Sequence, residues 1–258
     1  MAEQAKAVTL VELSLKDHSD VKIDPSCAIK VAEKQHLINL KVSELSMAVS
    51  SSPVFLSRAS EEADWTISAI NSFEIDKNLF VEDEKWTATH IPVGMQTYPF
   101  FLMRKDGEEN SFTIGINENS EAFSKDKGEA LFEDGKASVR LSQATAQLEV
   151  EMKNNLHTYQ FAKKLSELEL IKPVDVQVIY QDGKTNILKG LNTLDEAKLN
   201  ELGTEQFEEL RKAGYLGPIY SMLISIYQFN NLIRLHNNQS SAKVVQVKLE
   251  PPKEEAAA

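Results

Sequence analysis

Six polar and aromatic residues in the first 100 positions are the best candidates in this sequence for a binding or reactive site: His18, His36, Glu44, Trp86, Tyr98 and Phe100. Imidazole and carboxylate groups exchange protons and hydrogen-bond polar ligands. Aromatic rings offer a large contact area at little entropic cost. We therefore expect that an enzyme site, or a site for a small ligand or peptide, would form where these side chains converge.

The aromatic members belong to the densest cluster of aromatics and prolines in the chain, Trp86 and residues 90–101. Aromatics beside rigid prolines can line a groove for a peptide or a sugar. The alternative is a corner of the hydrophobic core, because most aromatic side chains are core residues. Both interpretations remain open from the sequence.

Other reactive arrangements have weaker support. Cys27 and His36 would make a nucleophile and base if they met, although a lone cysteine is more often a small buried apolar residue. No two histidines have the i, i+4 spacing of a helical zinc site. The acidic loops at 82–84 and 118–134 lack the regular series of Asp and Asn residues that binds calcium in an EF-hand loop. Common catalytic motifs are absent as well. We expect no metal and no cofactor, and the catalytic residues stay unassigned.

Charge and composition restrict the partners. The formal net charge is −11, and the arginines are spread along the chain, which disfavours nucleic acid. The apolar-rich stretch 219–235 is too short and too polar to span a membrane. The first 20 residues lack the basic and apolar regions of a signal peptide, and the single cysteine cannot form an intrachain disulfide. These features predict a cytoplasmic protein whose partner is a protein or peptide.

The elements that must position the candidate residues are short strands, two hairpins and several helices. Alternating or apolar runs predict strands, and a capped apolar segment predicts a short helix between them. Asp-Gly pairs accept the backbone of a tight turn. The strands are expected at 8–15, 53–56 and 65–70, the helix at 43–50, and the hairpins at 100–116 around Asp106-Gly107 and at 174–191 around Asp182-Gly183.

Residues 137–170 contain no Gly or Pro and predict a long central helix with two apolar stripes. Its length predicts a bend or break, and the weak helix propensity of asparagine places it at Asn154-Asn155. The second stripe, Val139, Ala146, Val150, Phe161 and Leu168, suggests a surface for a homo-oligomer.

Helices at 195–202, 204–213 and 218–235 and a strand at 244–249 follow the second hairpin. The strand is expected at a sheet edge, beside the N-terminal strand. The expected fold class is α+β, with a mixed, mainly antiparallel sheet, a long central helix and a C-terminal helical segment. We predict one domain over residues 1–236 and a partly disordered tail over 237–258.

Short motifs in this order resemble the bacterial SapC family, which is related to surface-layer proteins. The resemblance covers about residues 13–235 and includes residues 15–18, 53–55, 78–81 (Asn-Leu-Phe-Val), Trp86 and 98–100 (Tyr-Pro-Phe). Downstream, residues 131–135, 182–183, 190–191 and 214–216 also fit. The chain departs from the family pattern at residues 68–73 and 95–97.

The resemblance implies a noncatalytic accessory or interaction protein, linked to the handling or export of a cell-surface protein. It supplies no established catalytic residues. The alternative is an enzyme, or a protein that binds a small ligand or peptide, at a site near His18, His36, Glu44, Trp86 and Tyr98.

Overall fold

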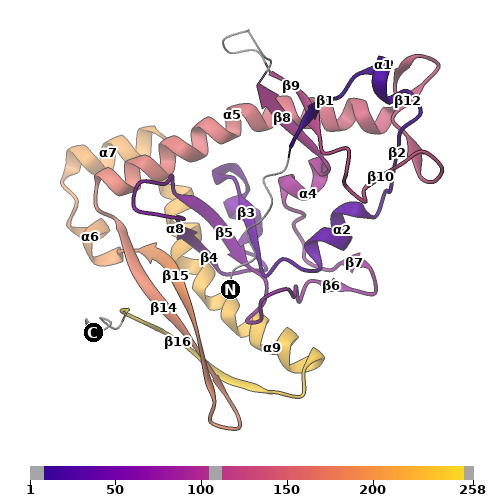
Figure 1. Cartoon of the computed structure of the whole chain (residues 1–258). Coiled ribbons are helices and arrows are strands. Elements are labelled where there is room, and N and C mark those ends of the chain that lie inside the picture. Colours follow the sequence, from indigo (N-terminus) through magenta and orange to yellow (C-terminus); the bar gives the residue numbers. More distant parts are fainter. Residues whose placement is uncertain (1–8, 105–111, 253–258) are drawn as a thin grey trace. The chain divides into compact units, whose positions relative to one another are not determined.

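The computed structural model describes residues 9–104 and 112–252 (Figure 1). Their contacts group them into two compact units. Unit 1 comprises Met1–Val31 and Gly94–Lys153, and unit 2 comprises Ala32–Val93 and Asn154–Ala258. All strand pairings among the described residues are antiparallel. The expected α+β class with a mainly antiparallel sheet is therefore confirmed.

The described residues of unit 1 form three small sheets, in the orders β1-β9-β8, β10-β2-β11 and β12-β13. Their strands are β1 (Val11–Glu12), β2 (Lys22–Ile23), β8 (Phe100–Arg104), β9 (Phe112–Ile116), β10 (Phe123–Ser124), β11 (Glu129–Ala130), β12 (Phe132–Glu133) and β13 (Lys136–Ala137). The helices are α1 (Leu15–His18), the first part of α5 (Val139–Glu167), and all but one residue of α2 (Cys27–Ala32) and α4 (Val93–Thr97). Ala32 and Val93 belong to unit 2.

The core of unit 1 forms where α5 packs on these sheets. Leu141, Ala144 and Leu148 of α5 are buried against Phe100 and Ile116. Their spacing of three and four residues places them on one helix face. Each large apolar side chain buried in this way contributes about 1.5–3 kcal/mol to folding. The first apolar stripe of the central helix is predicted to comprise Leu141, Ala144, Leu148, Met152, Tyr159 and Ala162. Its first three residues face the core of this unit, whereas Met152 is 40% exposed.

Gly128 permits the close pairing of β11 with β2 in unit 1. Its φ is +112°, and a Cβ at this position would lie 2.3 Å from the carbonyl oxygen of Ile23. Only glycine accepts this conformation and this approach without displacing the backbone.

Unit 2 is built on a six-stranded sheet in the order β16-β14-β15-β4-β5-β3. The strands are β3 (Leu37–Leu40), β4 (Val54–Ser57), β5 (Thr66–Ile70), β14 (Ile171–Tyr180), β15 (Thr185–Leu194) and β16 (Val244–Glu250), with a separate hairpin of β6 (Val81–Glu82) and β7 (Lys85–Trp86). The helices are η1 (Val42–Glu44), α3 (Leu45–Ala48), α6 (Glu196–Glu201), α7 (Thr204–Lys212), α8 (Leu216–Ser225), η2 (Ile226–Gln228) and α9 (Phe229–Gln239), together with the last part of α5.

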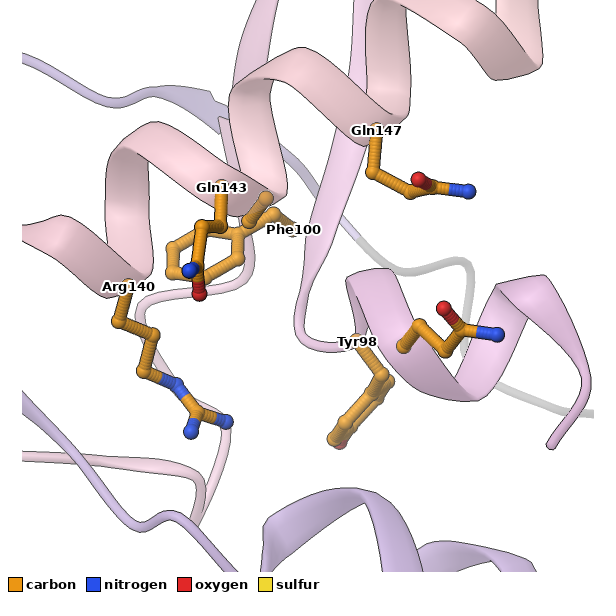
Figure 2. Close-up of a pocket in the computed structure, with 7 residues that line it drawn as sticks. Tyr98, Phe100, Arg140, Gln143 and Gln147 are labelled. Atoms are coloured by element: carbon orange, nitrogen blue, oxygen red, sulfur yellow. The ribbon is translucent and has the colours of Figure 1, made fainter.

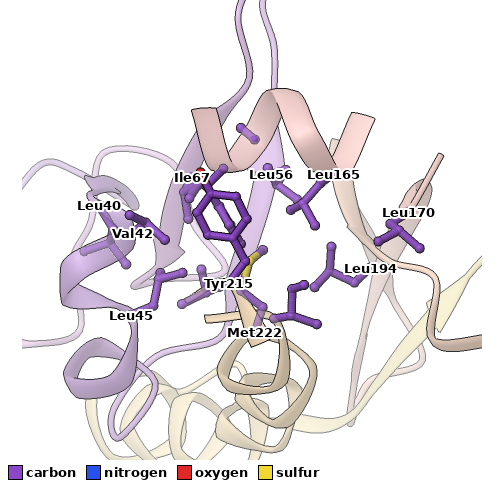
Figure 3. Packing of buried hydrophobic residues seen from close by; sticks show 14 of the residues in the cluster. Leu40, Val42, Leu45, Leu56, Ile67, Leu165, Leu170, Leu194, Tyr215 and Met222 are labelled. Carbon is purple, nitrogen blue, oxygen red and sulfur yellow. The ribbon is translucent and has the colours of Figure 1, made fainter. Parts of the chain in front are cut away.

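Two hydrophobic clusters cover this sheet. Val54 and Leu56 of β4 belong to the first cluster and Phe55 to the second, because successive side chains of a strand point to opposite faces. Figure 3 shows the first cluster, where Leu165 of α5 and Met222 of α8 converge with Leu56.

The long helix corrects two expectations. It runs without interruption through Asn154 and Asn155, so the expected break does not occur there, whereas the expected bend stays a prediction. Buried residues on both sides of the pair, Leu148 and Phe161, hold the helix by packing, which outweighs the weak helix propensity of asparagine. The second stripe does not form the single exposed surface that a homo-oligomer would use. Phe161 is fully buried in the first cluster of unit 2, whereas Val139 is 72% exposed.

The chain ends differ from expectation as well. Of the strand expected at 8–15, the structure shows the short strand β1. The strand cannot extend through Leu15, because Ser14 caps helix α1 by accepting a hydrogen bond from the backbone N–H of Asp17. The predicted C-terminal strand exists as β16, but it pairs with β14, whereas β1 pairs with β9 in unit 1. The turn at Asp106-Gly107 and the end of the tail, 253–258, lie outside the described residues.

Candidate functional site

Tyr98 of unit 1 belongs to the walls of two hollows, which we call together the Tyr98 site. It follows α4 and is joined to Pro99 by a cis peptide bond at the start of β8. The first hollow has a volume of about 240 Å³ and is lined by Gln96, Tyr98, Phe100, Arg140, Gln143, Ala144 and Gln147. The second has a volume of about 250 Å³ and is lined by Asp24, Cys27, Lys30, Val31, Tyr98, Ser120, Glu121 and Ala122.

One face of α5 forms a wall of the first hollow. Arg140, Gln143, Ala144 and Gln147 lie at intervals of three and four residues, which brings their side chains to the same side of the helix. Figure 2 shows Arg140 and Gln143 directed toward the same open space as Tyr98. Phe100, which is 2% exposed, and Ala144 add apolar surface. The hollow therefore combines an apolar base with several hydrogen-bonding groups.

Arg140 is the cation of the first hollow. Its Nη1 lies 3.6 Å from Oε2 of Glu129, which is too long for a hydrogen bond, and its side chain is 32% exposed. Among the described residues, neither Arg140 nor the amides of Gln143 and Gln147 donate a hydrogen bond to another side chain or backbone group. These donors face water and are available to a ligand.

The second hollow holds an ion pair and a buried thiol. Nζ of Lys30 donates a 2.6 Å hydrogen bond to Asp24. This bond, together with hydrogen bonds from Ser26, lowers the pKa of Asp24 to about 2. Cys27 is 4% exposed, and this burial raises the pKa of its thiol. A raised pKa keeps this group in its unreactive thiol form at neutral pH.

His18 also lies in unit 1, but it is not among the lining residues of either hollow. Its Nε2 is 2.9 Å from Oε1 of Glu118, and its Nδ1 is 3.1 Å from the backbone of Ser14. The ring is almost fully buried, at 3% exposure. These bonds give His18 a structural role, linking α1 to the segment after β9.

The other three predicted residues lie in unit 2, where two of them meet at a histidine that the sequence-based set omits. The carboxylate of Glu44 is 2.8 Å from Nε2 of His90, and Trp86 donates its indole N–H to the His90 carbonyl at 2.8 Å. Glu44 also accepts hydrogen bonds from the backbone of Lys41 and Val93. It is only 2% exposed, so these contacts form a buried clamp.

His36 takes no part in the hydrogen bonds of that clamp. Its backbone carbonyl accepts a 2.7 Å hydrogen bond from Asn71, and partial burial lowers the pKa of its imidazole. The predicted six therefore divide as His18, Tyr98 and Phe100 in unit 1 and His36, Glu44 and Trp86 in unit 2. Their convergence in a single site stays a prediction, as does the pairing of Cys27 with His36.

Sequence reasoning missed Arg140, Gln143 and Gln147, which supply hydrogen-bond donors to the first hollow. The signal was available in their spacing of three and four residues, but the helix was interpreted only through its apolar stripes. His90 was missed because its partner Glu44 is 46 positions away, and no local pattern predicts such a contact.

Neither a metal-binding cluster nor a membrane-spanning helix occurs in the part of the chain that the structure describes. No group of three His, Cys, Asp or Glu side chains there could hold a metal ion. None of the helices in residues 9–104 and 112–252 combines the length and apolar character needed to cross a bilayer.

The fold and the Tyr98 site define an α+β protein with a polar surface hollow. Comparison with known families supplies the identification: the family model SapC matches residues 13–232. The chain belongs to the SapC family. No curated protein and no solved structure matches it.

Proposed function

We propose that this SapC-family chain is a noncatalytic accessory protein that binds a peptide segment of a partner protein at the Tyr98 site. The partner in this proposal is a cell-surface protein that is being handled or exported, and the interaction takes place in the cytoplasm. The observation that carries the proposal is the pair of hollows sharing Tyr98, with amide and guanidinium groups on α5 that donate no hydrogen bond to another described residue.

The lining of the first hollow suits a polypeptide. A glutamine amide has both a donor and an acceptor, so Gln143 and Gln147 match the N–H and C=O groups of a peptide backbone. Tyr98 and Phe100 add aromatic surface for a side chain of the ligand. Tyr98 is common to the walls of the two hollows, which have volumes of about 240 and 250 Å³.

The same lining favours binding over catalysis. Among the described residues, neither hollow includes a histidine that could act as general base for Ser120 or Cys27. The Cys27 thiol is buried, and its raised pKa opposes nucleophilic attack. Glu44 and His90, which would otherwise suit proton transfer, are engaged in the buried clamp of unit 2.

The alternative function is an enzyme or a small-ligand binder that uses the same hollow. Its volume of about 240 Å³ is near the lower limit of small-molecule sites, so a compact metabolite is the competing occupant. Such a ligand would bind without a partner protein.

Affinity capture from a native lysate separates these functions. The full chain is immobilised beside a Gln147→Leu variant, which removes the amide at nearly constant size, and a Gln160→Leu control on an exposed part of the same helix. We expect the unchanged chain and the Gln160 variant to capture the same cell-surface protein, and the Gln147 variant to capture several-fold less.

Equal capture by the Gln147 variant would show that the partner binds elsewhere and would reject the Tyr98 site. Recovery of no partner, together with turnover of a small molecule by the unchanged chain, would reject the accessory function and favour the alternative.

A further inference from the structure

Arg140 is the group in the first hollow with the most unused binding capacity. A guanidinium carries five N–H donors in a planar fork. Among the described residues its one ionic neighbour is Glu129, at 3.6 Å, and that carboxylate is itself 54% exposed. The pair is therefore loose and well hydrated, and it contributes little to stability.

The neighbours of Arg140 supply what a bound carboxylate needs. A carboxylate accepts about four hydrogen bonds, two of them from an arginine fork. The amides of Gln143 and Gln147 line the same hollow and can supply further donors. The hydroxyl of Tyr98 lies 3.4 Å from that of Ser120, which lines the second hollow. Phe100 and Ala144, both buried, add apolar surface to the wall of the same hollow.

We infer that the first hollow recognises a carboxylate of the bound peptide, carried by an Asp or Glu side chain or by the C-terminus, through a bidentate contact with Arg140. This inference rests on the proposed peptide binding at the Tyr98 site. It adds the chemical class of the segment that is recognised.

A carboxylate fits the charge of the hollow better than a phosphate does. Arg140 is the only cationic side chain in the lining of the first hollow among the described residues, and its other polar partners are neutral amides and a phenol. One guanidinium balances a single negative charge, whereas a phosphate monoester carries nearly two at neutral pH. Glu129 beside Arg140 would repel either anion, and it would repel the more highly charged phosphate more strongly.

A peptide array tests the inference on the full chain. The probes are random dodecapeptides. Each is synthesised once with a free C-terminal carboxylate and once with a C-terminal amide. Each is also made in a second version in which Gln replaces Glu and Asn replaces Asp. Phosphoserine peptides and a glycan array form two comparison arms. Three variants accompany the unchanged chain: Arg140→Gln, Arg140→Lys, and Arg234→Gln as an exposed control in unit 2.

We expect the unchanged chain and the Arg234 control to prefer carboxylate peptides over their amide counterparts by roughly tenfold, the range of one charge-assisted bond. Arg140→Gln should abolish this preference. Arg140→Lys should retain part of it, since lysine keeps the charge but loses the planar fork. A merely structural role of Arg140 would lower all binding without changing the preference.

The possible failures are distinguishable. Peptide binding without carboxylate preference, or with a stronger preference for phosphoserine, overturns the inference and leaves the proposed peptide binding intact. Binding to glycans alone, or to no probe at all, overturns both. Retention of the preference in Arg140→Gln assigns the recognition to another residue and also overturns the inference.

Discussion

The imidazole of His90 lies 2.8 Å from the carboxylate of Glu44, and the same carboxylate oxygen accepts a hydrogen bond from the backbone N–H of Val93 at 2.7 Å. The second oxygen accepts from the backbone of Lys41 at 2.9 Å. One buried side chain therefore fixes the start of η1 and the segment 90–93 within unit 2. Both ionic partners are nearly buried, so this pair differs from the exposed ion pairs of the surface.

Replacement of Glu44 by Gln should destabilise unit 2. The amide turns one acceptor oxygen into a donor that faces either a backbone N–H or the imidazole, and a buried unpaired donor costs about 1–3 kcal/mol. Urea unfolding followed by tryptophan fluorescence measures this change, because Trp65 and Trp86 both belong to unit 2. The matched control is Glu82→Gln on exposed β6, which should keep its midpoint. An unchanged midpoint for Glu44→Gln would refute the structural role of the clamp.

The prediction of one domain over residues 1–236 can be tested with the chain's own probes. The single thiol, Cys27, is buried in the core of unit 1, whereas both tryptophans lie in unit 2. If the chain unfolds as one domain, labelling of Cys27 and loss of tryptophan fluorescence should share one urea midpoint. Two separated midpoints would show that the units unfold independently.

Asp24 should make unit 1 sensitive to acid. Its folded-state pKa of about 2 lies below the ordinary value of 3.8, so folding favours the ionised carboxylate. This contribution is present above about pH 4 and is lost as the pH falls toward 2. The carboxylate is 32% exposed, and solvent screening limits the effect to about 1 kcal/mol or less.

Thermal unfolding by circular dichroism checks this expectation. The difference in midpoint between the unchanged chain and Asp24→Asn should be largest near pH 6 and should shrink toward pH 2. The control is Asp64→Asn at an exposed position. A difference that is constant with pH would mean that the charge of Asp24 is not what stabilises the fold.

Removal of the acidic neighbour of Arg140 should strengthen carboxylate binding. Glu129→Gln eliminates the ionic contact at 3.6 Å, which a ligand carboxylate would otherwise have to replace. An exposed ion pair is worth about 0.2–1 kcal/mol, so affinity for a carboxylate peptide should rise by roughly 1.4- to 5-fold. Fluorescence anisotropy with a labelled peptide from the array measures it, with Glu133→Gln as control. Weaker binding would indicate that Glu129 itself contacts the ligand.

Local patterns predicted the main elements of the fold. The segments 100–104 and 112–116 form β8 and β9, and the hairpin around Asp182-Gly183 is β14 and β15, because alternation and turn chemistry are encoded nearby. The strands of two residues were not predicted. Pairings such as β2 with β10 and β11 join segments about 100 positions apart, and so short a strand has no periodicity of its own.

The candidate site was predicted only in part. Tyr98 and Phe100 were chosen as aromatic residues beside proline, and both line the first hollow. The polar face of α5 carries Arg140 and Gln143. Whether these side chains line a hollow depends on which side of the helix the sheets of unit 1 leave uncovered. That choice is made by tertiary packing, with Leu141 and Leu148 facing the core.

The central claim is that the Tyr98 site holds a segment of another protein, and photo-crosslinking tests it most directly. Benzoylphenylalanine is placed at Gln147 in the first hollow and, as a control, at Lys163 on an exposed face of the same helix. The account predicts an adduct from position 147 alone, which mass spectrometry maps to an acidic or C-terminal segment of a cell-surface protein. No protein adduct at position 147, or the same adducts from both positions, would contradict it.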